Sequence, residues 1–243
     1  MALYNRNYQN HQPEPNRSFT DASSQEAYGV RDETWLRSFI KQTYQLFAAS
    51  LLAGTVGAYV GMGMAPVIQS FYWGLVILEI ALIFGLNFVK NKPTLALIVL
   101  FAFTFITGLT ITPLLSSVLQ LPGGAGIVTN AFLMTTAAFG GLSLFALNTK
   151  RDFTAMGKML LIALIVLIVG GIVNIFLHSP LLHVMMAAGG AILFSFFILY
   201  DTQNIVKGNY DSPITAAAAL YLDFLNLFIS LLQILGIFGS NDD

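Results

Sequence analysis

The stretch ALYLDFLNLFISLLQ, residues 219–233, lies in an apolar run long enough to cross a membrane, yet Asp223 lies within it. A spanning helix needs roughly 20 apolar residues, and an acidic side chain at mid-bilayer costs a few kcal/mol on insertion scales. An ionisable residue in such a run therefore indicates a functional site with a partner. Two questions follow: whether the chain is a membrane protein, and which group is the partner of Asp223.

The composition answers the first question. The chain has 243 residues, of which 56% are hydrophobic and only 9% charged, whereas an average soluble domain carries about 25% charged residues. The charged residues are too few to cover the surface of a soluble domain of this length, so we expect an integral membrane protein. The chain has no cysteine, which excludes disulfides, thiol catalysis and cysteine-ligated metal sites.

Seven apolar segments are long enough to span a bilayer, and they predict an all-α, polytopic membrane protein. The segments cover approximately residues 41–62, 68–89, 94–114, 123–147, 157–177, 181–206 and 213–238. Their links are short, so the second to seventh segments are expected to form antiparallel hairpins. The last segment is the least uniform and is either a full span or a re-entrant helix. Residues 1–34 are polar and predict a disordered cytoplasmic tail, followed by a transmembrane domain over residues 35–243.

Basic residues give the predicted orientation. All eleven Lys and Arg lie in the N-terminal region or in alternate loops, and the loops near 63–67, 115–122 and 178–180 have none. Cytoplasmic loops of membrane proteins carry the excess of Lys and Arg. We therefore expect a cytoplasmic N-terminus, with the short Ser240-Asn241-Asp242-Asp243 tail outside.

Small residues recur every four positions on the first span. They are Ala49, Ala53, Gly57 and Gly61. Such a ridge lets another helix approach closely. It indicates either packing within the chain or dimerisation.

Three acidic residues fall within the predicted spans: Glu79, Asp201 and Asp223. Asp201 is the candidate partner of Asp223, because the two lie on consecutive spans. A Ser-Pro pair at 212–213 predicts a helix start, and Gly208 predicts the stop of the helix before it. At 1.5 Å per residue, Asp201 and Asp223 then lie about 10 and about 15 Å from the same loop. The two carboxyl groups are predicted at similar depth toward the cytoplasmic side, and whether they face each other depends on helix rotation.

The last span carries a polar stripe. Asp223, Asn226, Ser230 and Gln233 fall within an arc of about 80°, at 100° per residue. A polar stripe in a membrane helix faces protein or water rather than lipid, which predicts that this helix lies at the centre of the bundle. The stripe is either a structural hydrogen-bond network or the lining of a cation or proton path. Two ionisable acids favour the path, because a network needs only amides and hydroxyls.

Two close carboxyl groups in a medium of low dielectric cannot both ionise easily. We expect Asp201 and Asp223 to share one proton and so to sense pH. When deprotonated, they offer hard oxygen ligands that suit calcium. The sequence therefore predicts a transient calcium site at this pair, on a path that Asn226, Ser230 and Gln233 line.

Glu79 lies in the middle of the second span. It either lines the same path or is protonated and bonded to a threonine of the next span. The candidate threonines are Thr104, Thr107 and Thr110.

With these residues in view, the chain resembles the Bax inhibitor 1 family, also called the transmembrane Bax inhibitor motif family. The closest match is FFILYDTQNIVKGNYDSPITAAAALYLDFLNLFISLLQILG, residues 196–236, in which YDTQ is followed by LYLDFLNLF. Further support comes from KQTYQLFAASLLAGTVGAYVG, residues 41–61, and AFGGLSLFALNTKRDFTAMGK, residues 138–158. The resemblance covers the chain from about residue 37 onward.

This resemblance implies seven helices, with the last surrounded by the other six. It also implies calcium leak across a membrane, modulated by pH through two aspartates at the positions of Asp201 and Asp223. In relatives, a basic residue near the cytoplasmic end of the second helix is linked to the closed state, and only Lys90 or Lys92 can serve here. Eukaryotic relatives are tied to suppression of cell death. The short loops favour a bacterial member, in the inner (cytoplasmic) membrane.

Three functions compete at this point. The first is a pH-sensitive calcium leak channel, which needs a lipid bilayer and calcium as the transported ion but no cofactor and no nucleic acid. The second is a regulatory protein that binds membrane partners, such as proteases, without transport. The third is an intramembrane aspartyl protease, which is disfavoured because Asp223 follows Ala219-Leu220-Tyr221-Leu222 and not the Gly-x-Gly element of those enzymes. We therefore expect no enzyme activity.

Overall fold

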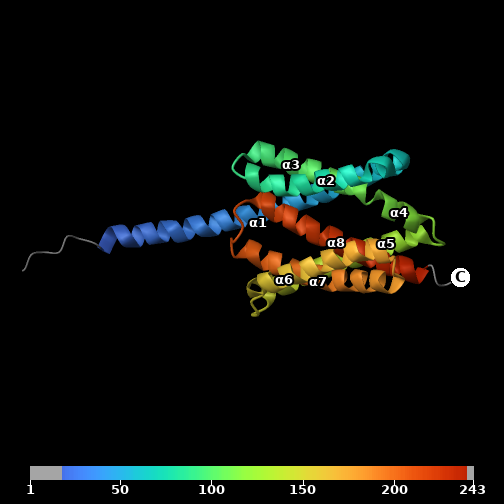
Figure 1. Ribbon diagram of the computed structural model, residues 1–243. Coiled ribbons are helices and arrows are strands. Elements are labelled where there is room, and N and C mark those ends of the chain that lie inside the picture. Colours follow the sequence, from blue (N-terminus) through green and yellow to red (C-terminus); the bar gives the residue numbers. More distant parts are fainter. Residues whose placement is uncertain (1–17, 240–243) are drawn as a thin grey trace, which may run out of the picture. The chain divides into compact units, whose positions relative to one another are not determined.

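The computed structural model describes residues 18–239, with side-chain environments from Glu33 onward, and this part of the chain is all α-helical (Figure 1). The elements in chain order are α1 Ser18–Gly63, α2 Ala65–Val89, α3 Pro93–Thr110, α4 Thr112–Leu119, α5 Gly124–Asn148, the 3-10 turn η1 Thr154–Met156, α6 Gly157–Leu177, α7 Pro180–Val206 and α8 Pro213–Gly239. Within the described range, seven helical stretches are long and apolar enough to cross a membrane, with α3 and α4 forming one stretch. The predicted fold class, an all-α protein with seven spans, is confirmed.

The two ends of the chain bear on one predicted boundary. α1 begins at Ser18, inside the segment predicted as a tail, while residues 1–17 and the tail after residue 239 lie outside the described residues. The disordered tail and its boundary therefore stay predictions. Within the described range, the chain divides into two compact units between Ser38 and Phe39, and the fold below is that of the second unit.

The third span is broken where the sequence predicts continuity. α3 ends at Thr110 and α4 begins at Thr112, with Pro113 in the first turn of α4. Proline has no backbone N–H to donate to the preceding turn, which explains a new helix start at this point. The predicted span 94–114 is correspondingly too short, since the helical stretch continues to Leu119.

The core of this unit is built along α8. Half of the most apolar window of α8 is buried, 50%, compared with 39% for the next most buried span. Its residues Ala217, Leu220, Phe224 and Leu227 share one cluster with side chains of α1, α3, α5 and α7. Phe47 of α1 and Phe139 of α5 stack at 4.8 Å between ring centroids, and both rings contact Phe224. A position of α8 inside a ring of six helices stays a prediction.

Glycines bring α1 and α3 into close contact. A Cβ added at Gly57 lies 2.1 Å from the carbonyl oxygen of Phe105, and one added at Gly61 lies 2.2 Å from Oγ1 of Thr112. Gly108 of α3 meets the backbone of Gly54 in the same way. Two members of the predicted small-residue ridge therefore pack against α3 and α4 within the chain.

Candidate functional site

The α7–α8 hairpin sets the positions of the two central aspartates. Gly208 has a φ of +68°, and the N–H groups of Gly208 and Asn209 donate to the carbonyls of Ile205 and Asn204 at 3.1 and 2.9 Å. This pattern is a Schellman motif, which ends α7 and reverses the chain. α8 then starts at Pro213, with the hydroxyl of Ser212 accepting from the N–H of Ile214 at 3.1 Å. Both predicted helix ends are confirmed.

Asp201 of α7 and Asp223 of α8 are brought together at this end of the hairpin. Their exposed fractions are 5% and 4%, and the two carboxyl groups interact directly. Oδ1 of Asp201 accepts a hydrogen bond from the hydroxyl of Tyr210 at 2.7 Å. Oδ2 of Asp223 is buried without a hydrogen-bond partner. Helix rotation, which the sequence left open, thus turns the two side chains toward each other.

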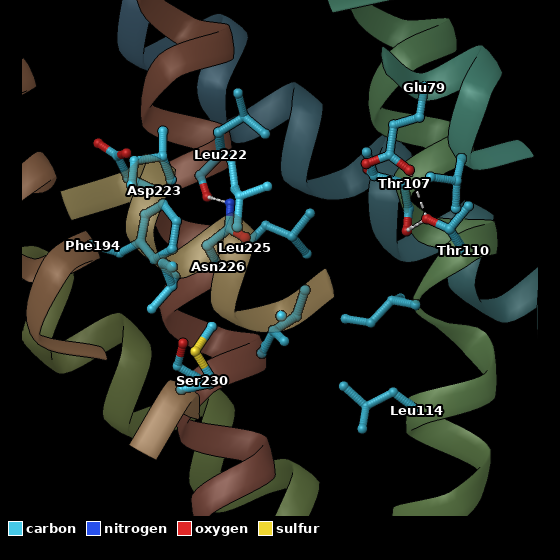
Figure 2. A pocket seen from close by; sticks show the side chains of 18 of the residues that line it. Glu79, Thr107, Thr110, Leu114, Phe194, Leu222, Asp223, Leu225, Asn226 and Ser230 are labelled. Carbon is cyan, nitrogen blue, oxygen red and sulfur yellow. Dashed lines mark hydrogen bonds between the residues drawn. The ribbon is translucent and has the colours of Figure 1, made fainter. Parts of the chain in front are cut away.

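A cavity of about 970 Å³ lies beside this pair. Its walls come from α2, α3, α4, α6, α7 and α8. Figure 2 shows Glu79, Thr107 and Thr110 on one wall, with Asp223 and Asn226 on the other. The lining includes all six residues that the sequence predicted for a path: Glu79, Asp201, Asp223, Asn226, Ser230 and Gln233.

Glu79 both lines the cavity and bonds to a threonine of α3, while its protonation stays a prediction. Its carboxylate Oε2 accepts from the hydroxyl of Thr110 at 2.9 Å, and the half-buried side chain also lines the cavity (Figure 2). The hydroxyl of Thr107 donates to the carbonyl of Thr104 at 2.7 Å and also bonds the hydroxyl of Tyr221. Thr110 is therefore the threonine that holds Glu79 at the cavity wall.

The polar stripe of α8 continues along the cavity. Asn226 donates from Nδ2 to the carbonyl of Leu222 at 2.8 Å, which leaves its amide oxygen for other contacts. Ser230 is buried against Gly190 of α7, where an added Cβ would lie 2.6 Å from Oγ. Gln233 is half-buried and lines the cavity one turn further along. The stripe thus gives the cavity hydrogen-bonding groups along α8 from Asp223 to Gln233.

The two candidate gating cations lie away from the aspartate pair. Nζ of Lys90 lies 2.5 Å from Oδ2 of Asp211, in the α7–α8 loop, and neither Lys90 nor Lys92 lines the cavity. The neighbouring ammonium lowers the pKa of the exposed Asp211 carboxyl below its usual value. In this conformation Lys90 ties the end of α2 to the loop after Asp201, and the role of either lysine in gating stays a prediction.

Two residues of the hairpin were not predicted as part of the site. Tyr210 lies in the loop, and its contact with Asp201 depends on how the loop folds back, which helix periodicity cannot show. Gln203 lies two residues after Asp201 and accepts from the N–H of Phe153 at 2.7 Å. Its Nε2 donates to the carbonyls of Arg151 and Ala146 at 2.8 and 3.2 Å. In the YDTQ element, Asp201 thus lines the cavity and Gln203 holds the α5–α6 loop.

The transient calcium site expected at Asp201 and Asp223 stays a prediction. Among the residues from 18 to 239, no group of three or more His, Asp or Glu side chains is arranged to hold a metal ion. Calcium in a resident site takes six to eight oxygen ligands. Two carboxyl groups beside a cavity supply only part of such a shell, so water has to complete it.

Comparison with known proteins agrees with the architecture. The sequence model described as "Inhibitor of apoptosis-promoting Bax1" matches residues 36–240. A protein of Campylobacter jejuni, described only as uncharacterized, is 52% identical over 99% of this chain and its own full length. A protein of Vibrio cholerae described as an uncharacterized membrane protein is 35% identical over 84% of this chain and 91% of its own length.

A viral relative carries a functional name. The Golgi anti-apoptotic protein of vaccinia virus, strain Lister, is 39% identical over 158 residues, which are 65% of each chain. The family match, the bacterial relatives and the seven spans all cover the same region of the sequence. The chain is a multi-pass membrane protein and belongs to the Bax inhibitor family.

Proposed function

We propose that this protein is a pH-sensitive calcium leak channel of the bacterial inner membrane, with a cytoplasmic N-terminus. One observation carries the proposal: the buried, interacting carboxyl groups of Asp201 and Asp223 lie on the wall of a cavity of about 970 Å³. Calcium prefers carboxylate, carbonyl and amide oxygens. Glu79 and the α8 stripe place groups of that kind along the same cavity.

Proton sharing supplies the pH response. Two adjacent carboxyl groups in a medium of low dielectric do not both carry a negative charge, so the pair holds a proton until the solution becomes alkaline enough to remove it. The charge available to a calcium ion at the cavity wall therefore changes with pH. The repulsion that follows full deprotonation favours separation of α7 and α8 at this level.

Calcium flux into liposomes containing the purified protein tests the proposal. Flux is measured from mildly acidic to mildly alkaline pH for the wild type, Asp201→Asn and Asp223→Asn. The control is Glu33→Gln, since Glu33 is an exposed acid outside the cavity. We expect pH-dependent flux in the wild type and the control, and a lost or pH-independent flux in both pair variants. Equal flux in all four proteins would contradict the role of the pair.

A second function is favoured by the vaccinia relative, which is named as an anti-apoptotic protein. On this alternative the protein acts by binding membrane partners and does not transport ions. Isolation of a partner in stoichiometric amount, together with no calcium flux from the pure protein at any pH, would support it. Flux from the pure protein that depends on Asp223 would exclude it as the sole function.

A further inference from the structure

The cavity reaches the surface of the bundle between α2 and α6. Ile80 of α2 and Ile168 of α6 both line the cavity, yet 50% and 53% of these residues are exposed. α2 packs against α3, α4 and α8, whereas α6 packs against α7 and η1, and these two fully described helices make no extensive contact with each other. Both isoleucines lie well inside a span, at a depth where exposed side chains meet acyl chains. The bilayer therefore borders the cavity between Ile80 and Ile168, at a gap that we call the α2–α6 slot.

The charges inside the cavity are mostly of one sign. Glu79, Asp201 and Asp223 line it, no Lys or Arg belongs to the described lining, and His183 is the one basic side chain there. Oδ2 of Asp223 is also buried without a hydrogen-bond partner. A cleft lined by one sign of charge, with walls of low dielectric, concentrates ions of the opposite sign. The cavity is therefore suited to a cation.

The rest of the lining is mainly apolar and includes aromatic side chains. These are Tyr72, Phe103, Phe194 and Phe197. Figure 2 shows Phe194 with Asp223 on one side of the cavity and Glu79 on the other. Aromatic rings attract organic cations and also pack against their apolar groups, whereas calcium is bound by oxygen ligands. The volume of about 970 Å³ lies within the range of roughly 300–1,000 Å³ that is usual for pockets that hold small molecules. The lining thus fits a cation that carries apolar groups.

We propose that this cavity binds hydrophobic organic cations, of the ammonium or phosphonium class, which enter from the bilayer through the α2–α6 slot. The cationic centre lies between Glu79 and the aspartate pair, and the apolar groups pack against the aromatic side chains and the isoleucines of the slot. A lipid acyl chain would fill the slot but would leave the three acids without a counter-charge. Binding does not depend on calcium transport, and only its consequence, competition with calcium for the same carboxylates, rests on the proposed function.

The flanking helices are the two spans with the fewest buried residues. Within residues 18–239, only 6% of the most apolar window of α2 and of α6 is buried, compared with 28% or more for each of the other spans. Segments with few buried contacts move at low cost in free energy. The slot is therefore able to widen for a guest molecule without disturbing the core along α8.

Equilibrium dialysis of the purified protein in detergent against tetraphenylphosphonium tests the binding. Tetraphenylborate is the matched control, because it has nearly the same size and shape and the opposite charge. We expect saturable binding of the phosphonium and at least roughly tenfold weaker binding of the borate, since the charge on the ligand meets acids in a medium of low dielectric. Equal binding of the two would mean that the cavity accepts apolar molecules of any charge, as it would an acyl chain, and would overturn the proposal.

Removal of the acids tests the site. We expect Glu79→Gln, and the double variant Asp201→Asn with Asp223→Asn, each to bind tetraphenylphosphonium roughly tenfold more weakly. Glu33→Gln, at an exposed acid outside the cavity, is the control and keeps the wild-type affinity. Circular dichroism verifies that each variant is folded. Wild-type affinity in either folded cavity variant would overturn the position of the cationic centre between the two walls.

A bulky side chain at the slot tests the route of entry. Ile168→Trp narrows the slot, and Ile165→Trp is the matched control, because Ile165 is an equally exposed isoleucine of α6 that does not line the cavity. Rapid filtration of proteoliposomes measures the association of radiolabelled tetraphenylphosphonium, after subtraction of the uptake by protein-free liposomes. We expect a several-fold slower association in Ile168→Trp and the wild-type rate in Ile165→Trp. Equal rates in the two variants would overturn entry through the slot.

Calcium flux separates this inference from the proposed function. In an active wild type, we expect tetraphenylphosphonium to inhibit calcium flux over the same concentrations at which it binds, and tetraphenylborate to have no such effect. Binding of the phosphonium by a protein that conducts no calcium would support this inference and contradict the proposed function. Calcium flux from a protein that binds no phosphonium would overturn this inference and leave the proposed function standing. Flux that saturating phosphonium does not change would exclude a shared site.

Discussion

Asp201 and Asp223 lie on consecutive antiparallel helices with their carboxyl groups buried beside each other, yet only Asp201 has a hydroxyl donor, from Tyr210. The environments of the two acids therefore differ: the carboxyl group of Asp201 accepts a hydrogen bond from Tyr210, and that of Asp223 has a buried oxygen without a partner. A buried oxygen without a hydrogen-bond partner lowers the free energy of unfolding. Replacement of Asp223 is thus expected to raise the stability of the protein and to impair calcium flux.

Asp223→Asn is expected to raise the thermal stability of the protein in detergent. The amide removes one of two adjacent acids and can donate to Asp201, and a hydrogen bond to a charged group is worth about 1.5–3 kcal/mol. The gain is expected to be larger at alkaline pH, where the wild-type pair loses its shared proton. Thermal unfolding at two pH values measures it. A lower midpoint than the wild type at alkaline pH would show that the asparagine finds no partner there.

Glu79→Gln is expected to reduce calcium flux without unfolding the protein. The glutamine keeps an acceptor for the hydroxyl of Thr110 but removes the negative charge from the wall opposite Asp223. We expect a loss of several-fold in flux and a change in unfolding free energy within about 0.5 kcal/mol. Thr110→Val serves as the comparison, because it keeps the charge and removes the donor. If Glu79→Gln lowers the thermal midpoint and leaves flux unchanged, the residue is structural.

The helices were predictable because membrane spans depend on length and apolarity, which are properties of the sequence itself. The predicted segment 157–177 matches α6 at both ends, and the last segment, predicted as 213–238, is a continuous helix to Gly239. The break at Ile111 was missed, although Pro113 signals it, because the apolar run continues through it. The similar depth of Asp201 and Asp223 was also predictable, because it depends only on the helix ends and the rise per residue.

Contacts that depend on helix rotation and loop path were not predictable in this way. The spacing predicted that Asp201 and Asp223 lie at a similar depth, but it could not predict that their side chains face each other. Spacing also gave no sign that Tyr210 reaches back to Asp201, or that Lys90 pairs with Asp211 instead of the aspartate pair. Such contacts follow from tertiary packing, which a single helical period does not encode.

Gly57→Ala is expected to destabilise the contact between α1 and α3. The new methyl group would lie 2.1 Å from the carbonyl oxygen of Phe105, a backbone atom that moves only with its helix. Overpacking of this kind costs about 1–3 kcal/mol. Gly140→Ala is the matched control, since no atom lies within 4 Å of the added Cβ there. Thermal unfolding of both variants in detergent decides the matter, and equal midpoints would contradict the close approach of α1 to α3.

Gln203→Leu is expected to loosen the α5–α6 loop. The substitution removes an acceptor for the N–H of Phe153 and donors to the carbonyls of Arg151 and Ala146. Unsatisfied buried groups cost about 1–3 kcal/mol each, and we expect a lower thermal midpoint with faster amide exchange at Phe153. Gln69→Leu, at an exposed position of α2, is the control. Unchanged exchange at Phe153 would mean that another group replaces Gln203.

The Asp152–Lys207 pair predicts a pH dependence that is independent of the cavity. The hydrogen bond from Lys207, and those from Thr154, lower the pKa of the exposed Asp152 carboxyl to about 2. An unfolded aspartate titrates near 3.9. The contribution of the pair to the unfolding free energy is therefore fully present above about pH 4 and is lost as the pH falls from there toward 2.

Carbon-13 carboxyl shifts of the labelled protein in detergent measure this titration directly. We expect a midpoint at about 2 for Asp152 in the wild type. In Lys207→Gln we expect a midpoint closer to that of an ordinary aspartate, because the first and largest cause of the shift has been removed. Added salt should move the wild-type midpoint in the same direction, since exposed charges are screened. A wild-type midpoint near 3.9 would show that Lys207 does not hold Asp152 in solution.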